Sequence, residues 1–232
     1  MKDETKFLIE IADKFGKEAQ NVLDFVAKSG NLEKAAKALN KAEATGSNED
    51  LPDGVYFIAE NHTSYQLMTD DTTSHFPTKY IGVKVGQRAI AVALKDLPGD
   101  NDGELQLLPL KNASPKTSEH YSYYKKARKY RFNAFEDFNG KTNTERLKGY
   151  GCTISLPEGE WIPSIGELAL LMMHISKVNQ AIELAGGEPI KGWHWSSTEH
   201  SQCCAWYINF SDGNTSFCSK YNWHVARAVA AF

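Results

Sequence analysis

The feature that most constrains this chain is a change of hydrophobic period near Leu51. Before it, apolar residues recur at helical spacing over residues 4–28 and again, over a shorter stretch, in residues 32–39. After it, short apolar runs such as VYFIAE, YQLM and YIGVKV are separated by turn residues, a pattern typical of β-strands. The sequence therefore predicts a helical hairpin over residues 1–45 and a sheet-rich α+β domain over residues 51–232.

Turn and capping residues predict two further elements of this domain. Gly86-Gln87 separates YIGVKV from AIAVALKDL and indicates a β-hairpin. Ser164 followed by Glu167 is a capping-box pattern, in which each residue satisfies a backbone N–H of the other. The apolar run after it predicts one helix over residues 164–185.

Three strand-like runs follow that helix. They are GWHWSST, AWYINF and the C-terminal VARAVAAF, and Ser211-Asp212-Gly213 marks a turn after the second run. The apolar character of the last run predicts a strand that ties the C-terminus into a sheet.

Composition and charge exclude several classes of protein. The 232 residues, 41% of them hydrophobic, suffice for a sizeable core, while the net charge of -3 argues against nonspecific nucleic-acid binding. Aromatic and basic residues alternate over residues 119–138, and we interpret them as a partly buried helix with a solvated basic face.

No run approaches the roughly 18 apolar residues of a membrane span, and the first residues lack the pattern of a secretory signal. We expect a location in the cytoplasm, or on a virion or cell surface reached by a non-standard route.

The cysteines are too few and too clustered to indicate a disulfide framework. Cys152, Cys203, Cys204 and Cys218 are therefore expected to be reduced. Adjacent residues on a strand point to opposite faces, so a bond between Cys203 and Cys204 is not expected. A Cys203–Cys218 pair remains open.

A series of ordered motifs carries a resemblance to a known family. WIPSIGEL, GGEPIKGWHWSST, AWYINFSDGN, SKYN and VARAVAAF resemble a bacterial and phage C-type-lectin-like family that includes variable proteins of diversity-generating retroelements. The resemblance covers residues 51–232 and is strongest from Trp161 onward. It implies a C-type-lectin-like fold with a twisted antiparallel sheet and an exposed variable face near the C-terminus. Its implied scaffold residues are Trp193, Trp195, Trp206, Phe210 and Gly213, together with Ser196, Ser197 and Thr198.

The segments between these scaffold residues show no apolar period and no single chemistry. Random replacement of adenines in AAC or AAT codons yields Asn, His, Ser, Cys, Phe, Tyr, Thr and Asp, and most residues of these segments belong to that set. Gln202 and Trp223 do not. Aromatic and small polar residues are also the types that binding surfaces favour. The predicted variable patch comprises His194, His200, Ser201, Cys203, Cys204, Asn214, Ser216, Phe217, Cys218, Tyr221, Asn222, Trp223 and His224.

The resemblance implies a display protein that binds a macromolecular target, a protein in the first instance, without a chemical step. The N-terminal hairpin is expected to mediate self-assembly into a homo-oligomer or attachment to a larger particle or cell surface. Two other interpretations remain open. One is a structural or adhesin-like module whose polar loops are not diversified. The other is a thiol enzyme related to formylglycine-generating enzymes, which share the broader fold and use paired cysteines.

No cofactor, metal site or catalytic residue is expected from the sequence. The histidines and cysteines lack the Cys-x-x-Cys or His-x-x-x-His spacing of zinc sites. Sugar-binding C-type lectins hold calcium through a Glu-Pro-Asn type of motif, and here Glu188-Pro189-Ile190 places an apolar residue at the amide position. Phosphate-binding loops, nucleophile elbows and paired carboxylates do not stand out either.

Overall fold

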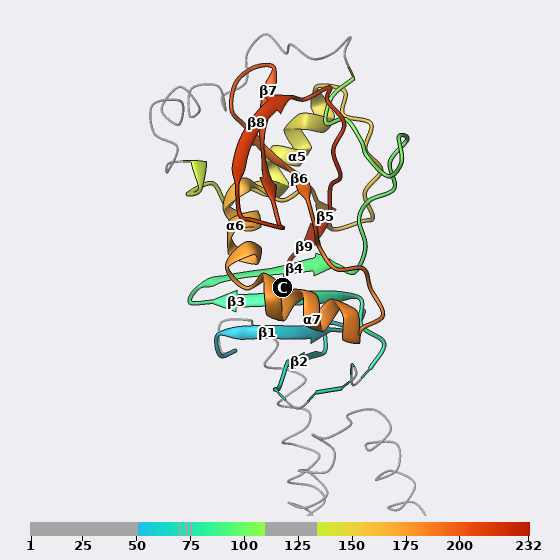
Figure 1. The fold of residues 1–232 in the computed structure, drawn as a ribbon, viewed down its shortest axis with the longest axis vertical. Helices are drawn as coiled ribbons and strands as arrows, with labels where there is room; N and C mark the ends of the chain where they lie inside the picture. Colours follow the sequence, from blue (N-terminus) through green and yellow to red (C-terminus); the bar gives the residue numbers. More distant parts are fainter. Residues whose placement is uncertain (1–50, 70, 73, 75, 110–133) are drawn as a thin grey trace, which may run out of the picture.

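The computed structural model describes residues 51–69, 71–72, 74, 76–109 and 134–232 (Figure 1). The predicted hairpin over residues 1–45 lies outside these residues, as does most of the predicted helix over residues 119–138. The described chain combines α-helices with antiparallel strands and is richer in strands than in helices, which confirms an α+β class.

The larger sheet of the described chain has the strand order β2-β1-β3-β4-β9-β5, with every neighbouring pair antiparallel. The predicted hairpin is confirmed, because Val85 pairs with Arg88 and Gly86 adopts the positive φ of 57° that the tight turn requires. Pairing of the C-terminal strand with both β4 and β5 confirms that the chain end is tied into the sheet. The strands are β1 (Gly54–Ile58), β2 (Ser64–Gln66), β3 (Tyr80–Val85), β4 (Arg88–Ala93), β5 (Glu160–Trp161) and β9 (Val229–Ala230).

A second described sheet has the order β6-β7-β8 and lies at the other end of the molecule from β1 and β2 (Figure 1). It comprises β6 (Trp193–Glu199), β7 (Cys204–Asn209) and β8 (Thr215–Ser219). The predicted turn between β7 and β8 is confirmed by the Gly213 N–H, which donates to the Asn209 carbonyl at 2.8 Å. β8 is not predictable from its own residues, because TSFCS lacks a regular alternation of polar and apolar side chains.

The described helices are α5 (Gly140–Gly149), α6 (Ile165–Met173) and α7 (Ile175–Leu184). The prediction of one continuous helix over residues 164–185 is wrong, because the backbone leaves helical geometry at His174, with φ -116° and ψ 13°. The break lets α6 pack against β6 and β7 of the second sheet while α7 packs against β1 and β3 of the first (Figure 1). A straight helix could not follow both surfaces.

Two clusters of buried side chains connect these layers. One contains Phe57 and Ile81 of the larger sheet together with Leu168 of α6 and Val178 of α7. The other surrounds Trp195 and includes leucines of the chain that follows β4. β6 and β7 are therefore covered by α6 on one face and by the loop after β4 on the other.

The predicted capping box at the start of α6 is confirmed. The Ser164 hydroxyl accepts from the Glu167 N–H at 3.3 Å, and the Glu167 carboxylate accepts from the Ser164 N–H at 2.6 Å. The same hydroxyl donates to the Asp137 carbonyl at 2.7 Å, so the cap also holds the segment before α5.

Replacing Ser164 with alanine is expected to lower the free energy of unfolding by about 1–2 kcal/mol, because a buried helix N-terminus and a buried carbonyl lose their partner. Urea denaturation measures the change. The matched control is Ser176→Ala, which alters an exposed serine inside α7 and is expected to change stability by no more than about 0.5 kcal/mol. Equal stabilities of the two variants would contradict a stabilising role for the capping box.

Candidate binding surface

Most of the predicted patch residues, with the exception of His194 and Asn214, gather around β8 and the turns at one end of it. A tight turn joins β6 to β7, in which the N–H groups of His200 and Ser201 donate to the Cys204 carbonyl at 2.9 and 3.1 Å. The Lys220 N–H donates to the Cys203 carbonyl at 2.9 Å and joins this turn to the end of β8. Segments separated in sequence thus meet at one end of the second sheet.

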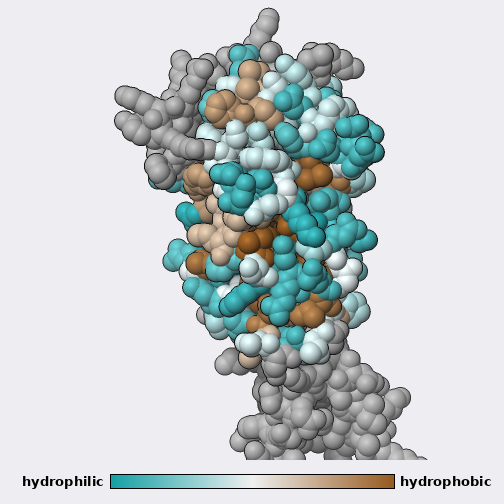
Figure 2. All heavy atoms as spheres, viewed as in Figure 1, coloured by the Kyte–Doolittle hydropathy of each residue, from teal (hydrophilic) through white to brown (hydrophobic). Residues whose placement is uncertain are grey.

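One side of β8 presents the Phe217 ring. Phe217 pairs with Trp206 across the sheet and is 45% exposed, whereas Trp206 is 4% exposed. The His200 ring stacks on Phe217 with the ring centroids 3.5 Å apart and the planes nearly parallel. Figure 2 shows hydrophobic colour at the end of the molecule where Figure 1 places β7 and β8. On this side, the exposed Phe217 ring packs edge-on against the buried Trp206 ring.

The opposite side of β8 carries Ser216 and Cys218, because side chains alternate along a strand. Cys218 Sγ lies 3.4 Å from His224 Nε2, and the His224 ring stacks on Tyr207 at 4.7 Å between centroids. Burial raises the pKa of Cys218 to about 11 and lowers the pKa of His224. At neutral pH the pair is therefore a neutral thiol beside a neutral imidazole and not an activated nucleophile.

The turn after β8 completes the surface. Trp223 is 38% exposed, and Tyr221 and Asn222 precede it. The Gln106 side-chain amide donates to the Tyr221 carbonyl, which holds this turn on the loop that follows β4. Asn214 precedes the other end of β8. At the usual rise per strand residue it lies about 13 Å from Cys218, so it does not join this group.

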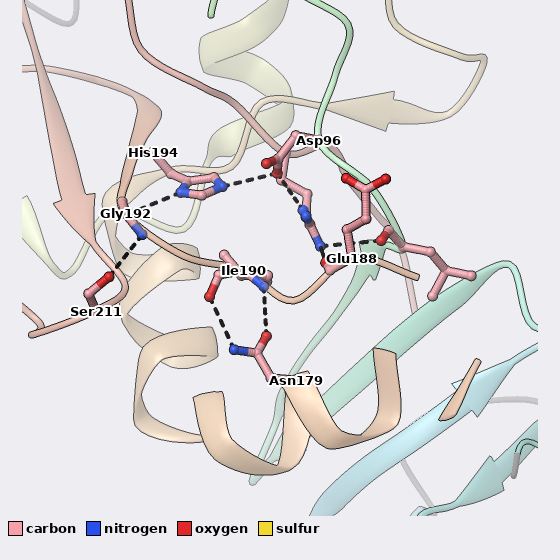
Figure 3. Close-up of polar contacts among 9 residues, drawn as sticks. Asp96, Asn179, Glu188, Ile190, Gly192, His194 and Ser211 are labelled. Atoms are coloured by element: carbon pink, nitrogen blue, oxygen red, sulfur yellow. Dashed lines mark hydrogen bonds and ion pairs between the residues drawn. The ribbon is translucent and has the colours of Figure 1, made fainter. Parts of the chain in front are cut away.

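His194 does not belong to the exposed patch, contrary to the prediction. Its side chain is fully buried, and Nε2 lies 3.0 Å from Asp96 Oδ1 (Figure 3). Arg227 Nε donates to the same carboxylate oxygen at 2.6 Å, and Arg227 Nη1 donates to the Glu188 carbonyl at 2.6 Å. His194 is the second residue of β6, and its buried side chain contacts the loop that contains Asp96.

The contacts with His194 and Arg227 change the pKa of Asp96. Burial by itself would raise the pKa, but hydrogen bonds and positive charge from His194 and Arg227 outweigh burial and lower the pKa below its ordinary value. The carboxylate is therefore the ionised centre of a network that joins the end of β4, the start of β6 and the segment before β9.

A second buried ion pair anchors the end of β8. Lys220 is fully buried, and its ammonium group donates to the Glu199 carboxylate and, at 2.9 Å, to the Gln202 carbonyl. Glu199 is the last residue of β6, so this pair ties β6, the β6–β7 turn and β8 together.

The predicted scaffold residues are buried, apart from Gly213 in its turn and Trp193, which are half-buried; Trp193 packs on Tyr207. Trp195 is fully buried and its indole N–H donates to the Leu105 carbonyl at 3.1 Å. The Ser196 hydroxyl donates to the Trp206 carbonyl at 2.8 Å, where the pairing of β6 with β7 is irregular. Gly213 has a φ of 74°, as its turn requires.

Four charged residues important to this site were missed by the sequence analysis: Asp96, Asp137, Lys220 and Arg227. The Asp137 carboxylate accepts from the Asn143 amide at 2.8 Å and from the Thr198 hydroxyl at 2.7 Å, and so connects α5 with β6. Arg227 offered a signal, since a single arginine within the apolar run VARAVAAF calls for a buried partner.

All four cysteines are free, and the Cys203–Cys218 bond that the sequence left open is not present. The expectation that Cys203 and Cys204 point to opposite faces of a strand is wrong. The strand β7 begins at Cys204, so Cys203 belongs to the turn, and the two sulfur atoms lie 3.5 Å apart.

Within the described ranges, no three His, Cys, Asp or Glu side chains come together as metal ligands, and no helix has both the length and the apolar character needed to cross a membrane. Glu188, the first residue of the motif compared with calcium sites, forms an exposed ion pair with Lys95 at 3.3 Å.

Comparison with known proteins adds little. No family model and no curated protein matches the sequence. Among solved structures, the chain is similar to a fimbrial protein from Bacteroides ovatus, with 15% sequence identity and a TM-score of 0.38. The match covers 78% of this chain and 49% of that chain, so this chain spans about half the length of that protein. At this identity and TM-score the similarity carries no argument about function.

Proposed function

We propose that residues 51–232 form a C-type-lectin-like domain that displays a diversified binding surface around β8 and binds a macromolecular target, a protein in the first instance. The observation that carries this proposal is the contrast between Phe217 and Trp223, which are exposed, and the tryptophans of β6 and β7, Trp195 and Trp206, which are buried; the Trp206 ring packs edge-on against Phe217. Aromatic rings held at a surface by a rigid base provide contact area at low entropic cost.

The distribution of the patch residues supports this proposal. His200, Ser201, Cys203, Phe217 and Trp223 lie in turns or on the last strand of the second sheet. Beneath them, backbone hydrogen bonds and the buried Lys220–Glu199 pair hold the chain independently of the exposed side chains. A surface built in this way accepts many sequences, because its supports are not among the residues that vary.

Deep sequencing of the gene's 3′ end across a population of the source organism tests diversification. Substitutions concentrated at the codons for His200, Cys203, Phe217, Tyr221 and His224 are expected. Codons for Trp195, Trp206 and Lys220 should remain unchanged. Uniformly low variation would overturn the proposal and leave a structural module with one fixed partner.

The same proposal predicts that the surface tolerates simultaneous replacement. A variant with Cys203, Phe217 and Trp223 all changed to serine should lose about 1 kcal/mol or less of stability, since all three side chains are exposed. Trp206→Ala removes the buried ring that packs edge-on against Phe217. This variant is expected to lose about 3–5 kcal/mol of stability. Thermal unfolding of both variants gives the comparison. A triple variant as unstable as Trp206→Ala would show that these residues are core elements, which excludes a variable role.

A further inference from the structure

The turn between β6 and β7 brings two thiols into contact at the surface. Cys203 is exposed and Cys204 is half-buried, and their Sγ atoms are 3.5 Å apart. The Ser201 hydroxyl lies 3.6 Å from Cys203 Sγ and also interacts with the Cys204 thiol. The thiols therefore differ in access to solvent and share one polar neighbour.

The surroundings also make the two thiols chemically unequal. The Ser201 hydrogen bond is the main cause that lowers the pKa of Cys203, and the Cys204 thiol and the charge of Lys220 act in the same direction. Burial raises the pKa of Cys204. Because the thiolate is the reactive form, Cys203 is the attacking group and Cys204 the group that responds second.

We propose that Cys203 and Cys204 form an exposed dithiol site that reacts with low-molecular-weight disulfides and closes to a Cys203–Cys204 disulfide. In the first step the Cys203 thiolate attacks one sulfur of the small disulfide, a mixed disulfide forms, and one small thiolate leaves and takes up a proton. In the second step Cys204 loses its proton and attacks Cys203 Sγ. The second small thiolate leaves, so one disulfide is reduced as one is formed.

Closure is expected to be readily reversible. Consecutive Cα atoms are about 3.8 Å apart, whereas ordinary disulfides join Cα atoms about 4.4–6.8 Å apart, so a bond between neighbours is strained and easily reduced. The carbonyls of both cysteines accept hydrogen bonds that hold the turn to itself and to Lys220. Closing the ring must disturb this turn and with it His200, which stacks on Phe217. The redox state of the pair would thus alter the shape of the surface, whether or not that surface is diversified.

The test uses the full chain, first reduced and then incubated with oxidised glutathione, with intact-mass spectrometry as the readout. The wild type is expected to lose two hydrogen atoms and retain no glutathione. Cys204→Ser should stop at the first step and carry one glutathione on Cys203, and Cys203→Ser should lose closure. Cys218→Ser is the matched control and should close as the wild type does.

Three outcomes would overturn the proposal. They are a wild type that keeps a stable mixed disulfide, a closure that is lost in Cys218→Ser, and a disulfide that joins two copies of the chain. Thermal unfolding of the reduced serine variants checks that each is folded before it is oxidised. Because the readout is the mass of the protein alone, its failure would leave the proposed binding function untouched.

Discussion

Asp96→Ala is expected to lower the free energy of unfolding by about 3 kcal/mol, at the lower end of the range for breaking a buried ion pair. The change leaves the Arg227 guanidinium, whose side chain is 1% exposed, without the carboxylate that its Nε contacts at 2.6 Å. Asp96 itself is 29% exposed, so water entering the vacated space offsets part of the loss. Urea denaturation at neutral pH measures the difference.

The neighbouring residue supplies the matched control for Asp96→Ala. Lys95 forms an ion pair with Glu188 at 3.3 Å, but both side chains are more than 60% exposed. Lys95→Ala is therefore expected to cost less than about 1 kcal/mol. If the two variants lost equal stability, the Asp96 network would not be the support that its burial indicates.

The contribution of Asp96 should also depend on pH. Its pKa is lower in the folded protein than the ordinary value of 3.8, so ionised Asp96 favours the folded state above that value. This stabilisation is lost as pH falls through the lowered pKa. The stability difference between the wild type and Asp96→Asn should therefore shrink in acid, and a difference that stays constant as pH falls below 3.8 would contradict the assignment.

Lys220→Met is expected to cost about 3–5 kcal/mol, because it leaves the Glu199 carboxylate buried without its cation. The Glu199 side chain is only 6% exposed, and the Gln202 carbonyl also loses its donor. Since this ion pair joins β6 to the end of β8, we expect the surface around Phe217 to loosen first. Urea denaturation gives the stability, and hydrogen exchange of β8 amides locates the change.

Two comparisons distinguish loss of the pair from loss of any lysine. Lys79→Met removes an exposed ion pair with Glu60, in which the side chains are 43% and 86% exposed, and should cost less than about 1 kcal/mol. The double variant Glu199→Leu/Lys220→Met removes both charges and should be more stable than Lys220→Met alone. A double variant less stable than the single one would show that the buried Glu199 carboxylate, deprived of the Lys220 ammonium group, is not the source of the cost.

Features set by neighbouring residues were predictable from the sequence. The β3–β4 hairpin follows from two apolar runs around Gly86, and the start of α6 follows from Ser164 and Glu167. These signals act over a few residues, because hydrogen bonding and backbone conformation in a turn or cap involve only the residues that form it.

Tertiary structure alone decided how the candidate surface is built. The break at His174 depends on two sheets that α6 and α7 must both cover, and burial of His194 depends on Asp96, which lies 98 residues earlier in the chain. β8 is a strand because β7 supplies its hydrogen-bonding partner, although its own residues carry no strand pattern. β7 begins at Cys204, so Cys203 lies in the turn before it, and this turn brings the sulfur atoms of Cys203 and Cys204 together. The sequence by itself determined the local elements, while long-range pairing and burial determined which side chains face solvent, because these depend on contacts that no local pattern encodes.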